Sequence, residues 1–329
     1  MRILVPIAFA GRIRTVASSG LGVGDADGRK MATTDDKPLT GPVFAAAGED
    51  GMRCVSRDGR VWTNIQHGRD GESYSAIAFG NGRCVVAGRF GGSAPTAATE
   101  DGAAWQAATY DAKYSNYIQT LVFFKDRFLG IGGNFFIESD DGLKWGPTKK
   151  FPEKKALFGI DPTLHRFALG NGVLAGVGDF GNTIVTHDGR DWTFAPHTKP
   201  ADALIDITFG NGMFVAGGLH GLRMRSQDGL TWTDRTPGEE GEHINFINFD
   251  GKRFVGVGQG ATYISEDGLK WERIPNQSAP TIAAFGNDTY VGALWPGKLL
   301  RSTDGIKWED VVELPQSVAA LAFGDLGKK

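Results

Sequence analysis

The element Asp-Gly-x-x-Trp occurs seven times, and no other feature constrains the fold of this chain as strongly. Its first residues are Asp58, Asp101, Asp141, Asp188, Asp228, Asp267 and Asp304. Successive copies begin 37 to 47 residues apart, and seven of the eight tryptophans belong to them. A period of about 40 residues is the length of one β-propeller blade. The repeat therefore predicts a ring of similar units.

A second element, Phe-Gly-Asn-Gly or a relative of it, precedes each copy, as at 79–82 and 209–212. Alternating apolar residues lead into it, and an Asn-Gly between two such runs indicates a tight hairpin, because both turn positions need positive φ. Each unit therefore contains strand A, a tight turn, strand B, a variable loop, strand C, the Asp-Gly turn and strand D. Seven such units predict an all-β fold, a seven-bladed β-propeller of four-stranded antiparallel blades over residues 42–329.

The ends of the repeat region predict how the ring closes. Residues 317–325 have the pattern of a lone strand A, whereas the first unit, residues 42–62, begins at strand B. The C-terminal strand is therefore expected to complete the first blade and leave no open edge. Residues 1–41 are expected to form an N-terminal extension packed on the ring or a degenerate eighth blade.

Composition excludes several classes of function. The net charge of -3 provides no basic excess for a nucleic-acid partner. No apolar run approaches the roughly 18–20 residues of a membrane span, and no convincing export signal is present, which favours the cytoplasm. Cys54 and Cys84 make no disulfide framework and no zinc site, so we expect free core thiols, no metal and no cofactor. A monomer is expected.

The repeated turn is expected to be structural. A Ser or Thr stands two residues before each Asp, at Ser56, Thr99, Ser139, Thr186, Ser226, Ser265 and Ser302. An Asp in a turn accepts hydrogen bonds from the backbone N–H groups that follow it, and a nearby hydroxyl can hold the same loop. Seven equivalent copies around a rim cannot converge on one substrate.

The phrases "SEDGLKW", "SQDGLTW" and "STDGIKW" resemble the Asp-box of bacterial neuraminidase repeats, found in sialidases and many other propellers. The resemblance covers roughly residues 42–323, with one residue fewer between Asp and Gly. It implies structural turns away from any active site, and it allows export. A sialidase-like enzyme would need three arginines, a Tyr–Glu nucleophile pair and an acidic proton donor. No Tyr lies near a Glu in a suitable sequence context, so the resemblance carries over no catalytic residue.

The variable loops indicate where a ligand would bind. The A–B and C–D turns are alike in all units, whereas the B–C loops and the D-to-A linkers vary and share the opposite face. Counting back three residues from the end of strand A gives one channel-facing level: Ala76, Thr120, Arg166, Asp206, Phe246, Ile282 and Ala320. Arg166 and Asp206 are expected to form either an ion pair between two blades or a ligand contact. The other candidate ligand-binding residues are His165, Asn245, His220, Arg89 and Trp295.

Three classes of function remain open. A non-catalytic module that binds a glycan or protein ligand through the variable-loop face is favoured, because no catalytic constellation can be assembled. A glycoside hydrolase or polysaccharide lyase at the channel mouth is the alternative. A hydrolase needs two carboxylates roughly 5–10 Å apart, for which Asp206, Asp179 and Glu242 are the candidates. An assembly scaffold with a large apolar outer patch is the third.

Overall fold

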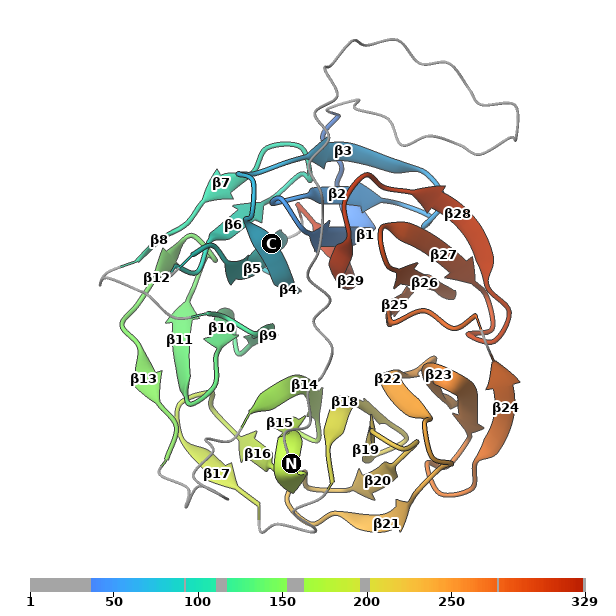
Figure 1. Cartoon of the computed structure of the whole chain (residues 1–329). Helices are drawn as coiled ribbons and strands as arrows, with labels where there is room; N and C mark the ends of the chain where they lie inside the picture. The colour runs from blue at the N-terminus through green and yellow to red at the C-terminus, as the bar shows by residue number, and fades with distance from the viewer. Residues whose placement is uncertain are drawn as a thin grey trace.

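The computed structural model of the chain describes residues 37–91, 93–110, 117–152, 163–195, 202–276 and 278–327. Its strands form antiparallel blades around a central channel, with the first strand of each blade innermost (Figure 1). The predicted all-β, seven-bladed propeller is confirmed. The single helical element of the described residues is the short 3-10 turn η1 (Asp179–Gly181), and none of their helices could span a membrane.

The strands of each blade follow one another from the channel outward. Blades 1 and 2 are β29 (Val318–Leu326), β1 (Gly41–Gly48), β2 (Arg53–Ser56) and β3 (Trp62–Gln66), then β4 (Ser73–Gly80), β5 (Arg83–Arg89), β6 (Thr96–Thr99) and β7 (Gln106–Ala107). Blades 3 and 4 are β9 (Thr120–Phe124), β10 (Arg127–Ile131), β11 (Phe135–Ser139) and β13 (Lys149–Lys150), then β14 (Leu164–Gly170), β15 (Val173–Gly178), β16 (Thr183–Thr186) and β17 (Trp192–Phe194). Blade 5 is β18 (Leu204–Gly210), β19 (Met213–Gly218), β20 (Arg223–Ser226) and β21 (Thr233–Thr236). Blades 6 and 7 are β22 (His243–Phe249), β23 (Phe254–Ser265) and β24 (Glu272–Asn276), then β25 (Ile282–Gly286), β26 (Thr289–Leu294), β27 (Lys298–Ser302) and β28 (Glu309–Glu313).

Two features depart from the regular pattern. In blade 6 the long strand β23 takes both middle positions: its first half pairs with β22, and from Gly260 onward it pairs with β24. Between blades 2 and 3, β8 (Thr109–Tyr110) and β12 (Lys144–Trp145) pair in parallel. The short β8–β12 pair joins the outer parts of two neighbouring blades.

The C-terminal strand closes the ring, as predicted. β29 pairs antiparallel with β1, and Phe323 lies opposite Phe44. Figure 1 shows the last strand beside the first one at the channel. Of the proposed N-terminal extension or degenerate blade, residues 1–36 lie outside the described residues, and β1 begins at Gly41.

The Asp-Gly-x-x-Trp turns share one hydrogen-bond pattern, which Asp267 illustrates. Its Oδ1 accepts from the backbone N–H groups of Leu269 at 2.8 Å and Lys270 at 2.9 Å, and from the Ser265 hydroxyl at 3.1 Å. The Ser265 Oγ in turn accepts from the backbone N–H of Gly268 at 2.8 Å. These bonds satisfy the turn's own backbone and leave the carboxylate committed to the fold.

The same turns also join neighbouring blades. At six of the seven joints, the backbone carbonyl of the repeated Asp accepts a hydrogen bond from the preceding blade or, for Asp101, from Leu39. The six acceptors are Asp58, Asp101, Asp141, Asp188, Asp267 and Asp304. Since Asn211 of an A–B turn also bonds the Glu266 carbonyl, the A–B turns and the Asp-Gly turns lie together on one face.

The opposite face carries the B–C loops and the linkers between blades. Gly51, Gly181 and Gly221 of three B–C loops donate backbone N–H bonds to residues of the following linkers. Between the two faces, the core consists of apolar strand residues and the repeated tryptophans; Trp62 and Trp145 are fully buried. Cys54 and Cys84 are buried free thiols in this core.

Candidate functional site

Five of the inner strands contain a β-bulge at the same place, near the end where the linker enters. At each bulge one residue is skipped in the pairing with strand B, and the following residue pairs in its place. The skipped residues are Ser75, His165, Ile205, Asn245 and Ala319. A bulge changes the direction of the side chains around it, so the linker end of the channel receives side chains from two successive positions of a strand.

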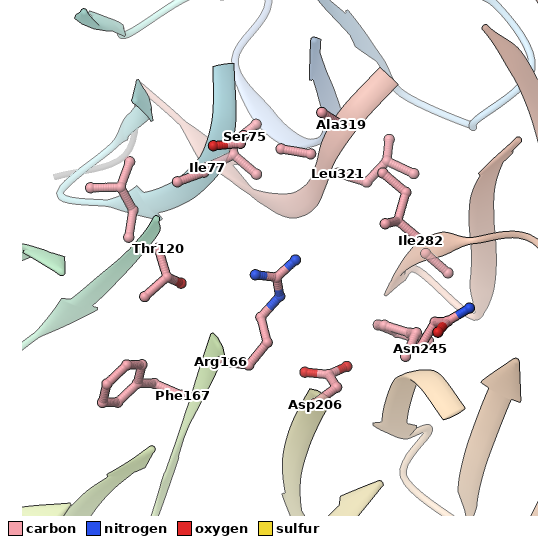
Figure 2. Close-up of a pocket in the computed structure, with 15 residues that line it drawn as sticks. Ser75, Ile77, Thr120, Arg166, Phe167, Asp206, Asn245, Ile282, Ala319 and Leu321 are labelled. Atoms are coloured by element: carbon pink, nitrogen blue, oxygen red, sulfur yellow. The ribbon is translucent and has the colours of Figure 1, made fainter. Parts of the chain in front are cut away.

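Three of the skipped residues, Ser75, Asn245 and Ala319, line a cavity of about 200 Å³ at the linker end of the channel. Arg166 and Asp206 lie in its wall, as the sequence predicts for a shared level on the inner strands, and so does Asn245, another candidate ligand-binding residue. All seven residues of the predicted level line the cavity: Ala76, Thr120, Arg166, Asp206, Phe246, Ile282 and Ala320. Figure 2 shows the Arg166 side chain extending into the channel, with Asp206 beside it on the next blade.

Asp206 is almost fully buried and holds two blades together. Its Oδ1 accepts from its neighbour Ile207 at 2.9 Å, and its Oδ2 accepts from the backbone N–H of Ile247 in β22 at 2.8 Å. Burial raises the pKa of this carboxyl to about 6, against the opposing effects of Arg166 and the two backbone donors. The structural contact of Asp206 is therefore with the backbone of blade 6.

Arg166 is exposed, and its guanidinium donates to the backbone carbonyl of His165 at 3.0 Å. It makes no ion pair with Asp206 or with any other carboxylate of the described residues. The ion pair between blades, one of the two alternatives that the sequence left open, is therefore absent. The physical reason is that both oxygens of Asp206 already accept backbone hydrogen bonds, which hold the carboxylate in its own position.

His165 and Asp179 lie together, and neither is part of the cavity wall. His165 Nε2 is 2.9 Å from Asp179 Oδ1, and each side chain is about one-third exposed, at 33% and 38%. Asp179 belongs to η1, in the B–C loop of the same blade. The carboxylate fixes the orientation of the imidazole, so Asp179 is engaged by a histidine on its own blade.

His220 forms a contact that the sequence did not reveal. Its backbone N–H donates to Nδ1 of His243 at 3.3 Å, and the two rings meet edge to face with 5.8 Å between their centroids. This contact joins the B–C loop of blade 5 to the first residue of β22. The linker before blade 6, "GEEGEH" (238–243), ends at His243, but the sequence does not show which loop this histidine contacts.

Glu242 lies in a buried network of structural bonds. Its carboxylate accepts from the Tyr263 hydroxyl and from Arg273, whose Nε is 2.8 Å from Oε1. These bonds lower the pKa of Glu242, although burial opposes them. The structure thus brings a Tyr and a Glu together, which the sequence did not predict, but Tyr263 is only 1% exposed and cannot reach a substrate.

Two other blades have an acidic residue at the position that Glu242 takes in its linker. In each case the acid stands two residues before the first buried residue of an inner strand that contains a bulge. Glu72 is paired with Arg69 at 3.1 Å, and Asp202 accepts bidentate hydrogen bonds from Arg235. Glu72, Asp202 and Glu242 are each at most 6% exposed. Since the same acid–arginine pairing recurs in separate blades, a structural role in holding the linker explains the position and partners of Glu242, and no catalytic role is needed.

The remaining predicted residues lie outside the cavity wall. Arg89 is exposed at the end of β5, and Trp295 is 79% exposed in the B–C loop of blade 7. Sequence reasoning missed the pair of hydroxyls at the cavity rim, where the Ser75 and Tyr117 oxygens are 2.8 Å apart. Among the described residues, no group of three or more His, Cys, Asp or Glu side chains could hold a metal ion.

No protein-family model matches the chain, and no curated protein sequence does. Solved seven-bladed propellers are similar in structure. YCF48 bound to D1 peptide has a TM-score of 0.58 at 14% identity, over 87% of this chain and 99% of that one. Virginiamycin B lyase from Staphylococcus aureus, as an inactive variant with quinupristin, has a TM-score of 0.60 at 11% identity, over 74% and 85%. Apo AztD from Citrobacter koseri has a TM-score of 0.55 at 12% identity, over 88% and 100%. At these identities the comparisons establish the fold, a seven-bladed β-propeller.

Proposed function

We propose that the protein is a non-catalytic binding module, and that its ligand is a segment of another protein held at the linker end of the channel. The observation that carries this proposal is Arg166: its guanidinium extends into the cavity and lacks a carboxylate partner among the described residues. A guanidinium with free donors binds an acidic group well. The fold neighbour YCF48, which is bound to a peptide, agrees with this proposal as an analogy of fold alone.

The apolar part of the cavity wall favours a protein side chain over a glycan. Its wall includes Ile77, Ile282 and Leu321, which cannot hydrogen-bond to sugar hydroxyls. Buried hydroxyls without partners would weaken binding. Trp295 could stack on a sugar ring, but it lies outside the cavity wall, so glycan binding is the second possibility.

The three carboxylates considered for catalysis are all engaged by other groups. Asp206 accepts two backbone bonds, Glu242 accepts from Arg273 and Tyr263, and Asp179 pairs with His165. A hydrolase that used two of these carboxylates directly, as proton donor and nucleophile, would have to release at least one of them from its partners. The exposed large apolar residues of the described chain, Val61, Tyr117, Leu169, Leu269 and Trp295, come from five different blades and offer no support for a scaffold patch.

We further propose that the seven repeats are shortened Asp-box units. The bonding around each repeated Asp supports this, since the carboxylate serves its own turn, as it does at Asp267. The assignment concerns the scaffold and adds no catalytic residue.

The proposed function is tested by selecting ligands from a displayed peptide library and, in parallel, from a glycan array. Arg166→Glu reverses the charge in the cavity, and Lys270→Glu makes the same change at an exposed residue of the opposite face. We expect selected peptides to bind the wild type and Lys270→Glu, and to lose at least about tenfold in affinity for Arg166→Glu. Equal binding to Arg166→Glu would refute the proposed site, and hits on the glycan array alone would favour the glycan alternative.

A further inference from the structure

The cavity at the linker end of the channel has a charged side and an apolar side. Arg166 and Asp206 come from neighbouring blades 4 and 5. Across the channel, blades 7, 1 and 2 present Ile282, Leu321 and Ile77 (Figure 2). A ligand group that fills this cavity therefore meets a cation on one side and hydrocarbon on the other.

The cation is available to a ligand for a structural reason. Arg166 has five N–H donors, of which one bond, to the His165 carbonyl, is made within the described residues. The nearest candidate partner, Asp206, cannot turn toward it without giving up the backbone N–H groups of Ile207 and Ile247. The remaining donors of Arg166 are therefore free for an anion in the cavity.

Asp206 also limits the charge of that anion. Its carboxylate lies close enough to Arg166 for the two charges to interact. Asp206 repels any anion in the cavity, and Arg166 is the one cation that the described residues place in its wall. A second negative charge on the ligand would therefore lack a cation partner, whereas a single carboxylate needs only the one cation. The arrangement therefore selects a monoanion over phosphate.

The size of the cavity limits the group further. Sites for drug-sized ligands have volumes of about 300–1,000 Å³, and this cavity has about 200 Å³. It accommodates one side chain or one small acid. The apolar wall fits a hydrocarbon stem, because burial of that stem is favourable at about 25 cal/mol per Å².

We infer that the group bound in this cavity is a single carboxylate on a short apolar stem, with the carboxylate on Arg166 and the stem against the wall of Ile77, Ile282 and Leu321. The inference rests on the proposed function and specifies its ligand chemistry. An acidic side chain of a protein and a small free organic acid both carry this group.

The test is a titration of the full chain with hexanoate, hexanamide and inorganic phosphate. Binding is measured by calorimetry or by NMR of the labelled protein. We expect hexanoate to bind at least about tenfold more tightly than hexanamide, which has the same stem without the charge. Phosphate should bind more weakly than hexanoate. Equal binding of the acid and the amide, or tighter binding of phosphate, would overturn the inference.

Two variants assign the effect to Arg166. Arg166→Gln should remove the preference for the acid over the amide, and Arg89→Gln, on the same face but outside the cavity wall, should keep it. Both side chains are exposed, so both variants should fold, which the thermal midpoint verifies. A preference that persists in Arg166→Gln would contradict the assignment.

A last part of the experiment asks whether the carboxylate belongs to a protein side chain or to a small free acid. It also allows this inference and the proposed function to fail separately. Capped tetrapeptides that differ only by Glu or Gln are titrated beside hexanoate. Preference for the Glu peptide supports both proposals, whereas hexanoate binding without peptide binding supports the inference and counts against a protein ligand. Selected peptides that need Arg166 but contain no acidic residue, together with no hexanoate binding, would leave the proposed function standing and overturn the inference alone.

Discussion

Gly210 at the end of β18 lies against the aromatic ring of Phe249 at the end of β22, so close that a Cβ on Gly210 would be 2.2 Å from the ring. The same Gly–Phe contact occurs at five joints between blades, with such distances of 2.0–2.2 Å. At the other two joints, Phe124 and Asp250 stand where the glycine would be. The glycine of Phe-Gly-Asn-Gly therefore permits close approach of two inner strands, in addition to its place in the hairpin.

Gly210→Ala should destabilise the protein, because the added methyl group requires the two strands to separate. We expect a loss of about 1–3 kcal/mol in the free energy of unfolding, measured by urea denaturation. Gly133→Ala is the matched control, since a Cβ there meets nothing within 4 Å. A loss of the same size in the control would show that the effect comes from the backbone and not from the contact with Phe249.

Ser265→Ala should expose the structural role of the hydroxyl in the repeated turn. Ser265 is 3% exposed, and its Oγ accepts from the buried backbone N–H of Gly268 at 2.8 Å. Removal of this acceptor leaves the donor unsatisfied, which costs about 1–3 kcal/mol. The neighbouring exposed residue provides the control: Glu266→Ala should change the unfolding free energy by less than about 0.5 kcal/mol. A negligible effect of Ser265→Ala would mean that water replaces the hydroxyl.

Glu242→Gln should lower stability, because Glu242 is buried and accepts charge-assisted bonds from Arg273. Since the Arg273 side chain is 35% exposed, solvent screens part of the attraction, and we expect a loss of about 1–3 kcal/mol. Thermal unfolding of this variant is compared with that of Glu240→Gln, an exposed residue of the same linker, which should match the wild type. Unchanged stability in Glu242→Gln would restore this residue as a candidate for catalysis.

Asp206 should make stability depend on pH in the direction opposite to most carboxylates. Its folded pKa of about 6 lies above the ordinary value of 3.8, so the folded state holds this proton more tightly than the unfolded state. The corresponding stability is present in full below the ordinary value and is lost as the pH rises through about 6. The expected loss is up to about 3 kcal/mol, since one pKa unit corresponds to about 1.4 kcal/mol.

The measurement is the unfolding free energy of the wild type minus that of Asp206→Asn, followed from pH 4 to pH 7.5. Carboxylates with lowered pKa values, such as Asp188 at about 2, contribute to both proteins and cancel in the difference. The difference should fall as the pH rises. If it is flat over this range, the carboxyl of Asp206 titrates near its ordinary value and its burial has no such effect.

The candidate site was predicted in part. The inner-strand level containing Arg166 and Asp206 does line one cavity, because a side chain three residues from a repeated turn has the same position in every blade. The bulges at Ser75 and Asn245 were not predicted, since a bulge depends on how two strands pair. The Arg166–Asp206 ion pair, one of the two alternatives that the sequence left open, is absent for the same kind of reason: Asp206 bonds a backbone N–H 41 residues away.

Sequence alone determined the architecture of this protein. The turn around Asp267 is made by residues within five positions of one another, so its hydrogen bonds are local, and seven copies of it specify seven blades. Only the tertiary structure decided which side chains meet across the ring. Tyr263 reaches Glu242 across 21 residues, and Arg166 faces hydrocarbon from blades on the far side of the channel. Such contacts depend on how the ring closes, and no local pattern of residues encodes that geometry.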